Sequence, residues 1–360
     1  MKIAFFHLYN DYSGSPKVLR NVGEWLLNKG YNVSIVSSKT NGVLDELKCY
    51  DNVEYDYFHY HPSCNKFSWV LHFVWAQICL FIKAFRYKDY QVFYINTIMP
   101  IGAAIAGKLL GKRVVYHYHE NAFIKSAFYR LLYKGMLRIA DKIICVSHYQ
   151  RSFLPKDMDI EVIHNALPSA FTSKLLPDPE NGYKRKNILM VSSLLLYKSP
   201  IEFIHLATEL SEYNFTLVLN ETDDAINSFI KEHKIVIPQN LSIFPRQSNI
   251  HQFYNNASIL LNLSNPNKVI ETFGMTALEG MSAALPVIVP TVGGITEFVE
   301  DGVNGYKIDV QNLDEIASKI REMLSDAELY CKLSKAAIAT ASKFTSEQMC
   351  NSLETTLLKS

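Results

Sequence analysis

The chain has 360 residues, a formal net charge of +1 at pH 7, 48% hydrophobic residues and 20% charged residues. These values are typical of a folded globular protein and exclude a disordered or low-complexity chain; the length favours two domains over one. Six cysteines are scattered without a C-x-x-C pair, which suits a reducing compartment and argues against a disulfide framework or a structural zinc site.

The charge is distributed unevenly. Residues 1–170 hold 20 lysines and arginines against 13 acids, whereas residues 171–360 hold 16 against 22. A basic first half suits an anionic membrane surface or a phosphate-linked acceptor, and two ordinary solvated surfaces are the alternative.

The first residues predict the start of a parallel α/β sheet. Residues 2–9 (KIAFFHLY) are expected to form a strand rather than a signal peptide, followed by a loop, a helix over 18–30 and a strand over 31–38. This order opens a doubly wound sheet, whose ligands bind beyond the carboxyl ends of the strands. The loop contains only Gly14 and no G-x-G-x-x-G, which argues against a dinucleotide-dependent oxidoreductase.

Residues 67–82 (FSWVLHFVWAQICLFI) form the most apolar run of the chain. The run contains His72 and Gln77 and, at 16 residues, is shorter than the roughly 20 needed to cross a bilayer. We expect a helix buried in the N-terminal domain; a helix lying at a membrane interface and a true span are the alternatives. The basic residues at its ends are Lys66, Lys83, Arg86 and Lys88.

A basic amphipathic helix is predicted over residues 121–142. Its sequence suits either a membrane surface or an ordinary helix whose apolar side faces the core. The expected apolar side comprises Phe123, Ala127, Leu131 and Leu132, and the basic side comprises Lys125, Arg130, Lys134 and Arg138.

A second α/β series is predicted from Ile188 onward. It ends in the stretch from Asn265 to Tyr306, which predicts a loop, a helix starting near Gly274, a buried strand and a Gly-Gly turn. The free backbone amides at the helix start form an anion site, and Gly274 permits close approach of a phosphate. Glu271 and Glu279 flank this site, so a diphosphate with a sugar at either end would fit between them. The residues at the helix start are Phe273, Gly274, Met275 and Thr276.

This stretch resembles the retaining glycosyltransferases of family 4, which have the GT-B fold. The resemblance depends on E-x-F-G-x-x-x-x-E at Glu271–Glu279, PVIVP at 286–290, Gly293-Gly294 with Glu297, and Gly302 with Gly305. It implies two Rossmann-like domains facing across a cleft and a C-terminal helix crossing back. The expected boundaries are residues 1–170 for the acceptor domain, 171–186 for a linker, 187–340 for the nucleotide-sugar domain and 341–360 for the returning helix.

The resemblance also implies roles for individual residues. Glu271 would contact the transferred sugar, His119 would approach it from the first domain, and Glu279 would bind the ribose. Lys198 and the amides from Phe273 to Thr276 would hold the diphosphate, with Gly14 in the first loop nearby. Family members carry an Arg where this chain has Ser193. Either Lys198 and the helix N-terminus suffice, or Lys17 or Arg246 supplies the missing charge.

No metal or other cofactor is expected. Asp157-Met158-Asp159 spells D-x-D, which holds a metal in the other large glycosyltransferase fold, but the sequence around it predicts a loop entering a strand. The eleven histidines show no metal-binding spacing.

The resulting hypothesis is a retaining, metal-independent glycosyltransferase that moves a sugar from a UDP- or GDP-sugar to a saccharide acceptor. A lipid-linked acceptor in surface polysaccharide synthesis, a cytoplasmic location and peripheral contact with the inner membrane face are expected, without a nucleic acid partner. The alternatives are another GT-B enzyme, such as an epimerase or a sucrose or trehalose synthase, and a non-catalytic nucleotide-sugar-binding protein.

Overall fold

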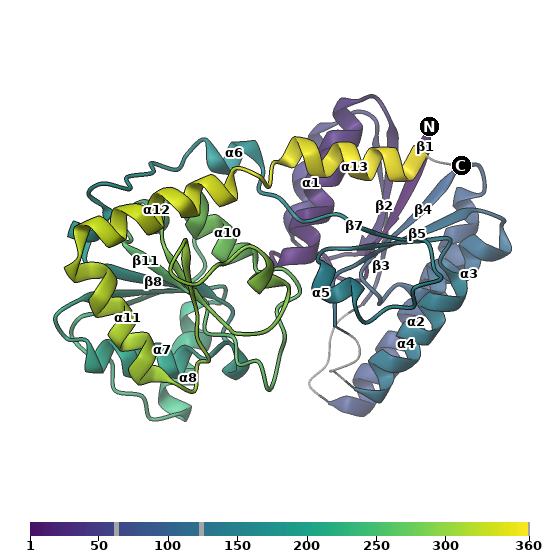
Figure 1. Cartoon of the computed structure of the whole chain (residues 1–360). Helices are drawn as coiled ribbons and strands as arrows, with labels where there is room; N and C mark the ends of the chain where they lie inside the picture. Colours follow the sequence, from purple (N-terminus) through teal and green to yellow (C-terminus); the bar gives the residue numbers. More distant parts are fainter. Residues whose placement is uncertain (61–64, 122–125, 359–360) are drawn as a thin grey trace. The chain divides into compact units, whose positions relative to one another are not determined.

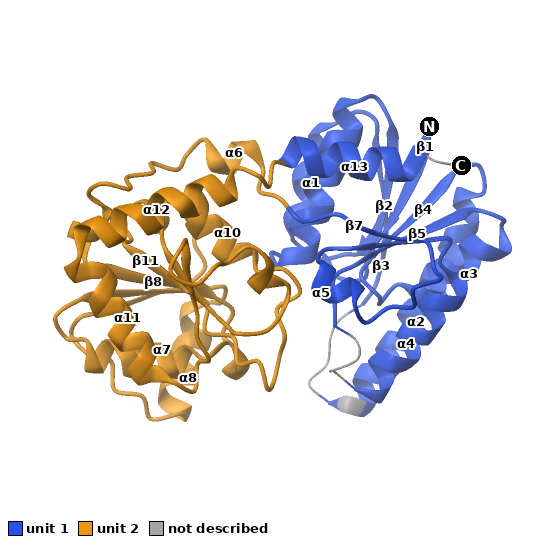
Figure 2. Cartoon of the chain, viewed as in Figure 1, with its two compact units in different colours: residues 1–165, 346–360 blue, residues 166–345 orange. Residues whose placement is uncertain are grey.

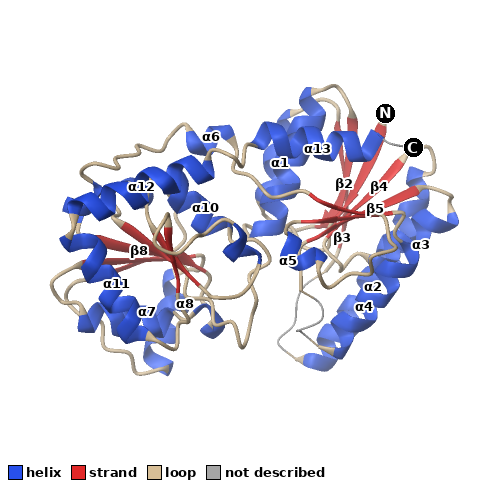
Figure 3. Ribbon diagram, viewed as in Figure 1, coloured by secondary structure: helices blue, strands red, loops and turns tan. Residues whose placement is uncertain are grey.

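A computed structural model describes residues 1–60, 65–121 and 126–358. The chain divides into two compact units (Figure 2): unit 1 comprises Met1–Asn165 with Ser346–Ser360, and unit 2 comprises Ala166–Thr345. Each unit contains one parallel sheet with helices packed on it, and each is described by itself below (Figure 3). Residues 171–186 belong to unit 2.

The sheet of unit 1 has seven parallel strands in the order β3-β2-β1-β4-β5-β6-β7. The strands are β1 (Lys2–Phe6), β2 (Asn32–Ser38), β3 (Val53–Phe58), β4 (Val92–Asn96), β5 (Arg113–Tyr118), β6 (Lys142–Cys145) and β7 (Ile160–Val162). The spatial order reverses between β1 and β4, and this reversal is where ligands bind in such sheets.

The helices of unit 1 cover both faces of its sheet. Because parallel crossovers are right-handed, the reversal of strand order places α1 on one face and α2, α3 and α4 on the other (Figure 1). The helices are α1 (Gly14–Asn28), η1 (Val43–Cys49), α2 (Lys66–Ala84), η2 (Phe85–Tyr87), α3 (Ile101–Leu109), α4 (Ala127–Ile139), α5 (His148–Arg151) and α13 (Ser346–Leu358).

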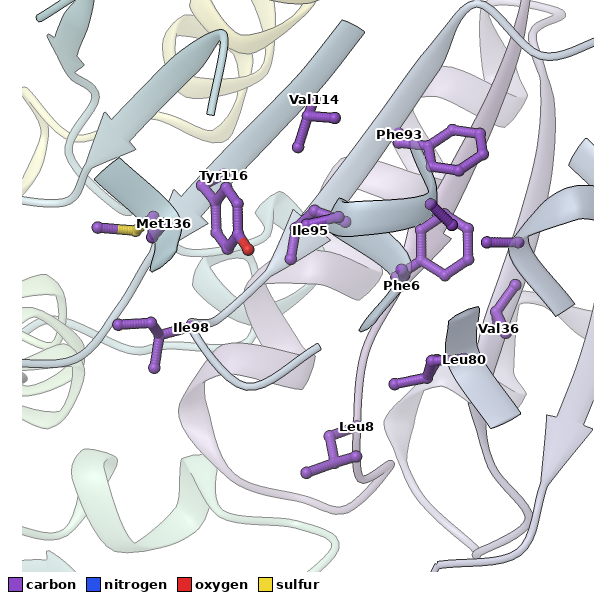
Figure 4. Packing of buried hydrophobic residues seen from close by; sticks show 14 of the residues in the cluster. Phe6, Leu8, Val36, Leu80, Phe93, Ile95, Ile98, Val114, Tyr116 and Met136 are labelled. Atoms are coloured by element: carbon purple, nitrogen blue, oxygen red, sulfur yellow. The ribbon is translucent and has the colours of Figure 1, made fainter. Parts of the chain in front are cut away.

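Strand residues and helix residues share the core of unit 1. Phe6 and Val36 from the sheet and Leu80 from α2 belong to one buried cluster, which continues to Tyr116 and Met136 (Figure 4). Successive residues of β1 and β4 point to opposite faces of the sheet, and those from Ile3 to Phe6 and from Val92 to Asn96 are all buried. This is expected for a parallel sheet with helices on both sides.

The C-terminal helix α13 belongs to unit 1, which confirms the expected return of the chain. The carboxylate of Glu354 accepts hydrogen bonds from Trp25 Nε1 (3.1 Å) and from the Tyr31 hydroxyl (2.8 Å). The Thr356 hydroxyl donates to Glu161 at 2.8 Å. These contacts fix α13 against α1 and against the end of the sheet at β7.

The sheet of unit 2 has six parallel strands in the order β10-β9-β8-β11-β12-β13. The strands are β8 (Asn187–Ser192), β9 (Asn214–Leu219), β10 (Leu241–Phe244), β11 (Ile259–Leu261), β12 (Val287–Val289) and β13 (Gly305–Lys307). The helices are α6 (Ser169–Thr172), η3 (Gly182–Arg185), η4 (Leu196–Lys198), α7 (Pro200–Glu209), α8 (Asp223–Glu232), α9 (His251–Asn255), α10 (Met275–Ser282), η5 (Gly294–Glu297), α11 (Leu313–Ser325) and α12 (Ala327–Ala341). The order reverses between β8 and β11.

The expectation that residues 67–82 form a buried helix is wrong for one side of that helix. Phe73, Ala76 and Leu80 lie in the core, but Phe67 is 74% exposed and Trp75 is 59% exposed. In the described part of the chain, the stretch 67–87 is the one helix that is long and apolar enough to cross a membrane by length and composition.

Two smaller expectations also need correction. Helix α1 begins at Gly14 rather than near residue 18, because Asp11 Oδ1 accepts hydrogen bonds from the backbone and hydroxyl of Ser13 and so ends the loop early. On α4, Ala127 and Leu131 lie on the solvent side with the basic residues, and Leu132, Tyr133 and Met136 form the buried side. Phe123 and Lys125 lie outside the described residues.

Candidate functional site

Lys198 and Glu271 form an ion pair at the carboxyl ends of β8 and β11. Lys198 follows β8 in η4, and Glu271 lies in the loop that leads from β11 to α10. Their side chains are only 21% and 17% exposed. The pair therefore lies where the strand order of unit 2 reverses, which is the ligand-binding position of a doubly wound sheet.

Two further side chains hold the carboxylate of Glu271. The Ser264 hydroxyl donates to Oε1 at 2.6 Å, and Asn262 Nδ2 approaches the same oxygen at 3.4 Å. Burial by itself raises the pKa of Glu271, but the charge and hydrogen bonds of Lys198, with those of Ser264 and Asn262, outweigh burial and lower this pKa. Glu271 is therefore an anion at neutral pH.

The backbone at Glu271 is fixed by the Gly293-Gly294 turn. Gly294 N donates to Glu271 O at 2.8 Å, and Gly293 forms a parallel bridge with Glu271. Gly293 has φ +122°, and a Cβ at this position would lie 2.5 Å from Glu271 O. A glycine is therefore required at position 293 for this turn to approach the backbone of Glu271 so closely.

The N-terminus of α10 lies beside the ion pair, as the sequence predicts. Gly274 caps the helix with φ +94°, and Asn262 Nδ2 lies 3.4 Å both from Glu271 Oε1 and from Thr276 Oγ1. Helix geometry leaves the amides of Met275 and Thr276 without acceptors inside the helix, so they can bind an anion. The Phe273 ring packs in the interior against Phe298 and Phe344, so only its backbone is available to a donor.

Glu279 lies on α10 and accepts a hydrogen bond from the Tyr254 hydroxyl through Oε2. Tyr254 is fully buried in α9, and burial together with the charge of Glu279 raises the pKa of its hydroxyl well above the ordinary value. The tyrosine therefore stays protonated and donates, which fixes the orientation of the Glu279 carboxylate.

The two remaining candidates in unit 2 lie on neighbouring loops. Ser193 begins the loop after β8, and its carbonyl accepts a hydrogen bond from Leu195 N at 2.9 Å. Arg246 follows β10, is exposed, and donates from Nε to Asn220 Oδ1 at 2.7 Å beyond the end of β9. The structure thus places Arg246 on the opposite side of β9 from β8.

In unit 1, His119 directly follows β5 and belongs to a polar network. Its Nε2 lies 3.0 Å from Asn96 Oδ1, and Asn96 Nδ2 lies 3.1 Å from His7 Nδ1. Since an amide oxygen only accepts, Nε2 of His119 carries the proton. Burial, followed by the nearby His117 and His7, lowers the pKa of His119 well below its ordinary value, so the ring is neutral at pH 7.

Gly14 lies at the first residue of α1, near this network in the fold of unit 1. The neighbouring Ser15 carbonyl accepts a hydrogen bond from Asn96 Nδ2 at 3.2 Å. A Cβ added at Gly14 would meet nothing within 4 Å. Lys17 lies one helical turn further on.

No group of three or more potential metal ligands occurs among the described residues. In the D-x-D sequence, Asp159 forms an ion pair with Lys142 at 2.6 Å. Asp159 of the D-x-D sequence therefore has a structural role in an ion pair.

Sequence reasoning missed several residues that hold the predicted ones. Tyr254 orients Glu279, Ser264 and Asn262 hold Glu271, and Asn96 holds His119. The two that follow β11 could have been found, because polar residues after a buried strand line the ligand-binding edge. Nothing in the sequence around Tyr254 indicates its partner on another helix.

The architecture of two parallel α/β units matches solved glycosyltransferases. The crystal structure of Anabaena HepE in complex with UDP-glucose superposes with a TM-score of 0.80, at 19% identity and covering 99% of each chain. This match establishes the GT-B fold that the sequence predicts.

Sequence comparisons then identify the family. The profile described as Glycosyltransferase Family 4 matches residues 12–171, and that described as Glycosyl transferases group 1 matches residues 174–340. An uncharacterized glycosyltransferase of Methanocaldococcus jannaschii is 28% identical over 257 residues, which are 69% of this chain and 68% of that protein. The lipopolysaccharide 1,2-N-acetylglucosaminetransferase of Salmonella typhimurium is 34% identical over 106 residues, 29% of this chain and 27% of that protein.

The chain is therefore a nucleotide-sugar-dependent glycosyltransferase. It belongs to glycosyltransferase family 4, as its sequence motifs indicate.

Proposed function

We propose that this enzyme transfers the sugar of a UDP-sugar to a lipid-linked saccharide during assembly of a surface polysaccharide and releases UDP, with retention and without a metal. The convergence of Lys198, Glu271 and the N-terminus of α10 carries the proposal. A uridine donor is favoured over GDP because the similar HepE structure holds UDP-glucose. The similarity to a lipopolysaccharide glycosyltransferase supports the acceptor class. A site of action at the cytoplasmic face of the membrane is part of the same proposal.

The leaving diphosphate is stabilised by the lysine and the helix. Lys198 donates to Glu271 and to Ser264 Oγ (3.2 Å), and an ammonium group has three N–H donors, so a third can reach a phosphate oxygen. The amides of Met275 and Thr276 supply donors on the side of α10. Negative charge that develops on the phosphate in the transition state is met by groups already in position.

Glu271 and Glu279 would bind opposite ends of the donor. Glu271 stays ionised beside Lys198 and can accept hydrogen bonds from hydroxyls of the transferred sugar. Glu279, oriented by Tyr254, would accept hydrogen bonds from the ribose. Within unit 1, the neutral ring of His119 donates from Nε2 to Asn96 Oδ1, which fixes its orientation.

Thermal unfolding with nucleotide sugars tests the donor. At 100 times Kd, a ligand of the folded state adds about 2.7 kcal/mol, which shifts the melting temperature of a domain of this size by a few degrees. We expect a shift with UDP-sugars that is larger than with GDP- or ADP-sugars. The shift should disappear in Glu279→Ala and persist in Glu232→Ala, which removes an exposed acid on α8.

Transfer assays test the acceptor. Labelled donor should give a labelled lipid-linked product with a polyprenyl-diphosphate saccharide as acceptor. It should give no labelled product in buffer without acceptor.

Two outcomes would contradict the proposal. A melting-temperature shift with GDP-sugars only would contradict the proposed base. Donor binding with transfer to soluble saccharides but not to the lipid-linked ones would contradict the proposed acceptor.

A further inference from the structure

Helix α2 presents a continuous apolar surface to solvent. Large apolar side chains recur every three or four residues along its exposed side, and each is at least 41% exposed. At 100° per residue these side chains span an arc of about 140°, over a helix about 28 Å long. They are Phe67, Val70, Leu71, Val74, Trp75, Ile78, Ile82 and, one residue beyond the helix, Phe85.

The opposite side of α2 is anchored in unit 1. Phe73, Ala76 and Leu80 lie in the core, and Figure 4 shows Leu80 there. Gln77 Oε1 accepts a hydrogen bond from Gly102 N of α3 at 3.0 Å. The Phe128 ring of α4 contacts the rings of Trp69 and Phe73 at centroid distances of 5.1 and 4.9 Å. Crossing a bilayer would pull this side out of the core, so α2 can lie in a membrane surface but not span it.

The charged side chains of the three helices around this surface are all basic, although Lys83 and Lys108 pair with Asp56 and Asp141 outside them. Helices α2, α3 and α4 contain no aspartate or glutamate and six basic residues: Lys66, Lys83, Lys108, Arg130, Lys134 and Arg138. The last three are exposed along one side of α4 and form no ion pair with the described acids. Each such cation near an anionic membrane favours binding by roughly fivefold.

We propose that the apolar side of α2, with the basic stripe of α4 beside it, docks this enzyme on an anionic lipid bilayer. The apolar side chains would enter the boundary between headgroups and acyl chains, where they need no hydrogen-bonding partner. A second copy is disfavoured, because an isologous interface would bring the same acid-free, basic helices together. This deepens the proposed function by naming the surface that reaches a lipid-linked acceptor, and only that link rests on the proposed function.

Vesicle flotation of the full chain, without donor or acceptor, tests the inference. We expect binding to vesicles of phosphatidylglycerol and phosphatidylcholine, and at least tenfold weaker binding to phosphatidylcholine alone. Leu71→Glu/Trp75→Glu/Ile78→Glu should lower binding at least tenfold. The matched control is Leu176→Glu/Val236→Glu, which changes two side chains of unit 2 that are 69% and 84% exposed, and it should bind like the wild type.

The basic stripe is tested separately with Arg130→Gln/Lys134→Gln/Arg138→Gln. From the roughly fivefold effect of each cation, we expect about a hundredfold loss on anionic vesicles and little change on neutral ones. High salt should likewise weaken binding of the wild type to anionic vesicles, because it screens the attraction between the basic stripe and the lipid headgroups.

Trp75 reports on insertion directly. Brominated acyl chains should quench the fluorescence of the wild type, and Trp75→Phe should remove most of the quenching. The other two tryptophans contact protein: Trp69 packs against Phe73 and Phe128, and Trp25 lies on the opposite helix layer against Glu354. All variants should keep the wild-type melting temperature and nucleotide-sugar shift, which separates this inference from the proposed function. Unchanged binding of the α2 variant, or a dimer in ultracentrifugation that this variant dissolves without any vesicle binding, would overturn the inference.

Discussion

The ammonium group of Lys198 and the carboxylate of Glu271 form a partly buried ion pair although 73 residues separate them in the chain. Because two loops from different strands meet in this pair, it both holds the site together and sets its charge. Because the two charges of the pair cancel, the N-terminus of α10 adds a positive element beside it.

Lys198→Met should destabilise unit 2 by about 2–4 kcal/mol, because it leaves a largely buried carboxylate without its counter-ion. Adding Glu271→Gln should recover at least about 1 kcal/mol, since the uncompensated charge is then removed. Denaturant unfolding of the two single variants and the double variant measures this coupling.

The matched control for that cycle is Lys335→Met. Lys335 pairs with Glu180 at 3.4 Å, but the two side chains are 57% and 71% exposed. Such a solvent-exposed pair contributes little to stability, so the substitution should leave the unfolding free energy nearly unchanged. Additive effects of the Lys198 and Glu271 substitutions would show that their contact contributes nothing to stability.

Tyr254→Phe should weaken donor binding about three- to thirtyfold and leave kcat within about twofold. The substitution keeps the ring but removes the hydroxyl that orients Glu279, and a ribose contact is made equally in the ground state and the transition state. Steady-state kinetics with varied donor give both constants.

Tyr330→Phe is the control for the loss of a buried tyrosine hydroxyl. Tyr330 is also fully buried in unit 2, and its hydroxyl donates to Ser258 O at 2.8 Å. We expect a similar loss of stability and an unchanged donor KM. An equal rise of KM in both variants would attribute the effect to general loosening of unit 2.

Gly293→Ala should cost about 3–5 kcal/mol and weaken donor binding. Its φ of +122° is nearly restricted to glycine, and the new Cβ would displace the Glu271 carbonyl oxygen, which lies 2.5 Å away. Chemical denaturation and donor titration measure the two effects.

Gly302→Ala separates backbone strain from collision. Gly302 also has a positive φ, +70°, but nothing lies within 4 Å of an added Cβ. We expect a cost of only about 1–2 kcal/mol and normal donor binding. Equal costs at both glycines would mean that the contact with Glu271 O is unimportant.

The sequence predicts the elements of this site better than their contacts. Gly274, Glu271 and Glu279 are found because a helix start, its glycine and its first turn form one local pattern. The contacts of Lys198 with Glu271 and of Tyr254 with Glu279 join distant segments, and no periodicity encodes such pairs.

Helix α2 shows a different limit of sequence reasoning. Its apolar residues surround the helix, so periodicity cannot tell which side is covered by protein; Leu80 is buried, whereas Ile78 and Ile82 are exposed. The prediction of burial assumed that the fold would cover every apolar residue. Only the positions of α3, α4 and the sheet reveal the uncovered side.

Lowering the pH should destabilise unit 1 already at pH values well above those at which carboxylates become protonated. His117 is fully buried, and burial lowers its pKa to about 3, whereas the unfolded chain titrates near 6.5. Between these values the unfolded state binds more protons, so stability falls as pH falls, by about 1.4 kcal/mol per pH unit for this residue. His7 and His119, whose pKa values burial also lowers, act in the same direction.

Urea unfolding at several pH values between 7 and 5 measures this slope. The window lies above the range in which Glu271 would lose its own contribution, because its pKa is lowered from 4.5 and its stabilisation is lost only as pH falls through that lower value. His117→Phe should flatten the slope by about one proton. Tyr94→Phe removes the hydroxyl 2.5 Å from His117 Nδ1 but keeps the titrating ring, so it should lower stability at every pH and leave the slope nearly intact. A slope that is the same in His117→Phe and in the wild type would show that this histidine is not the buried group that titrates.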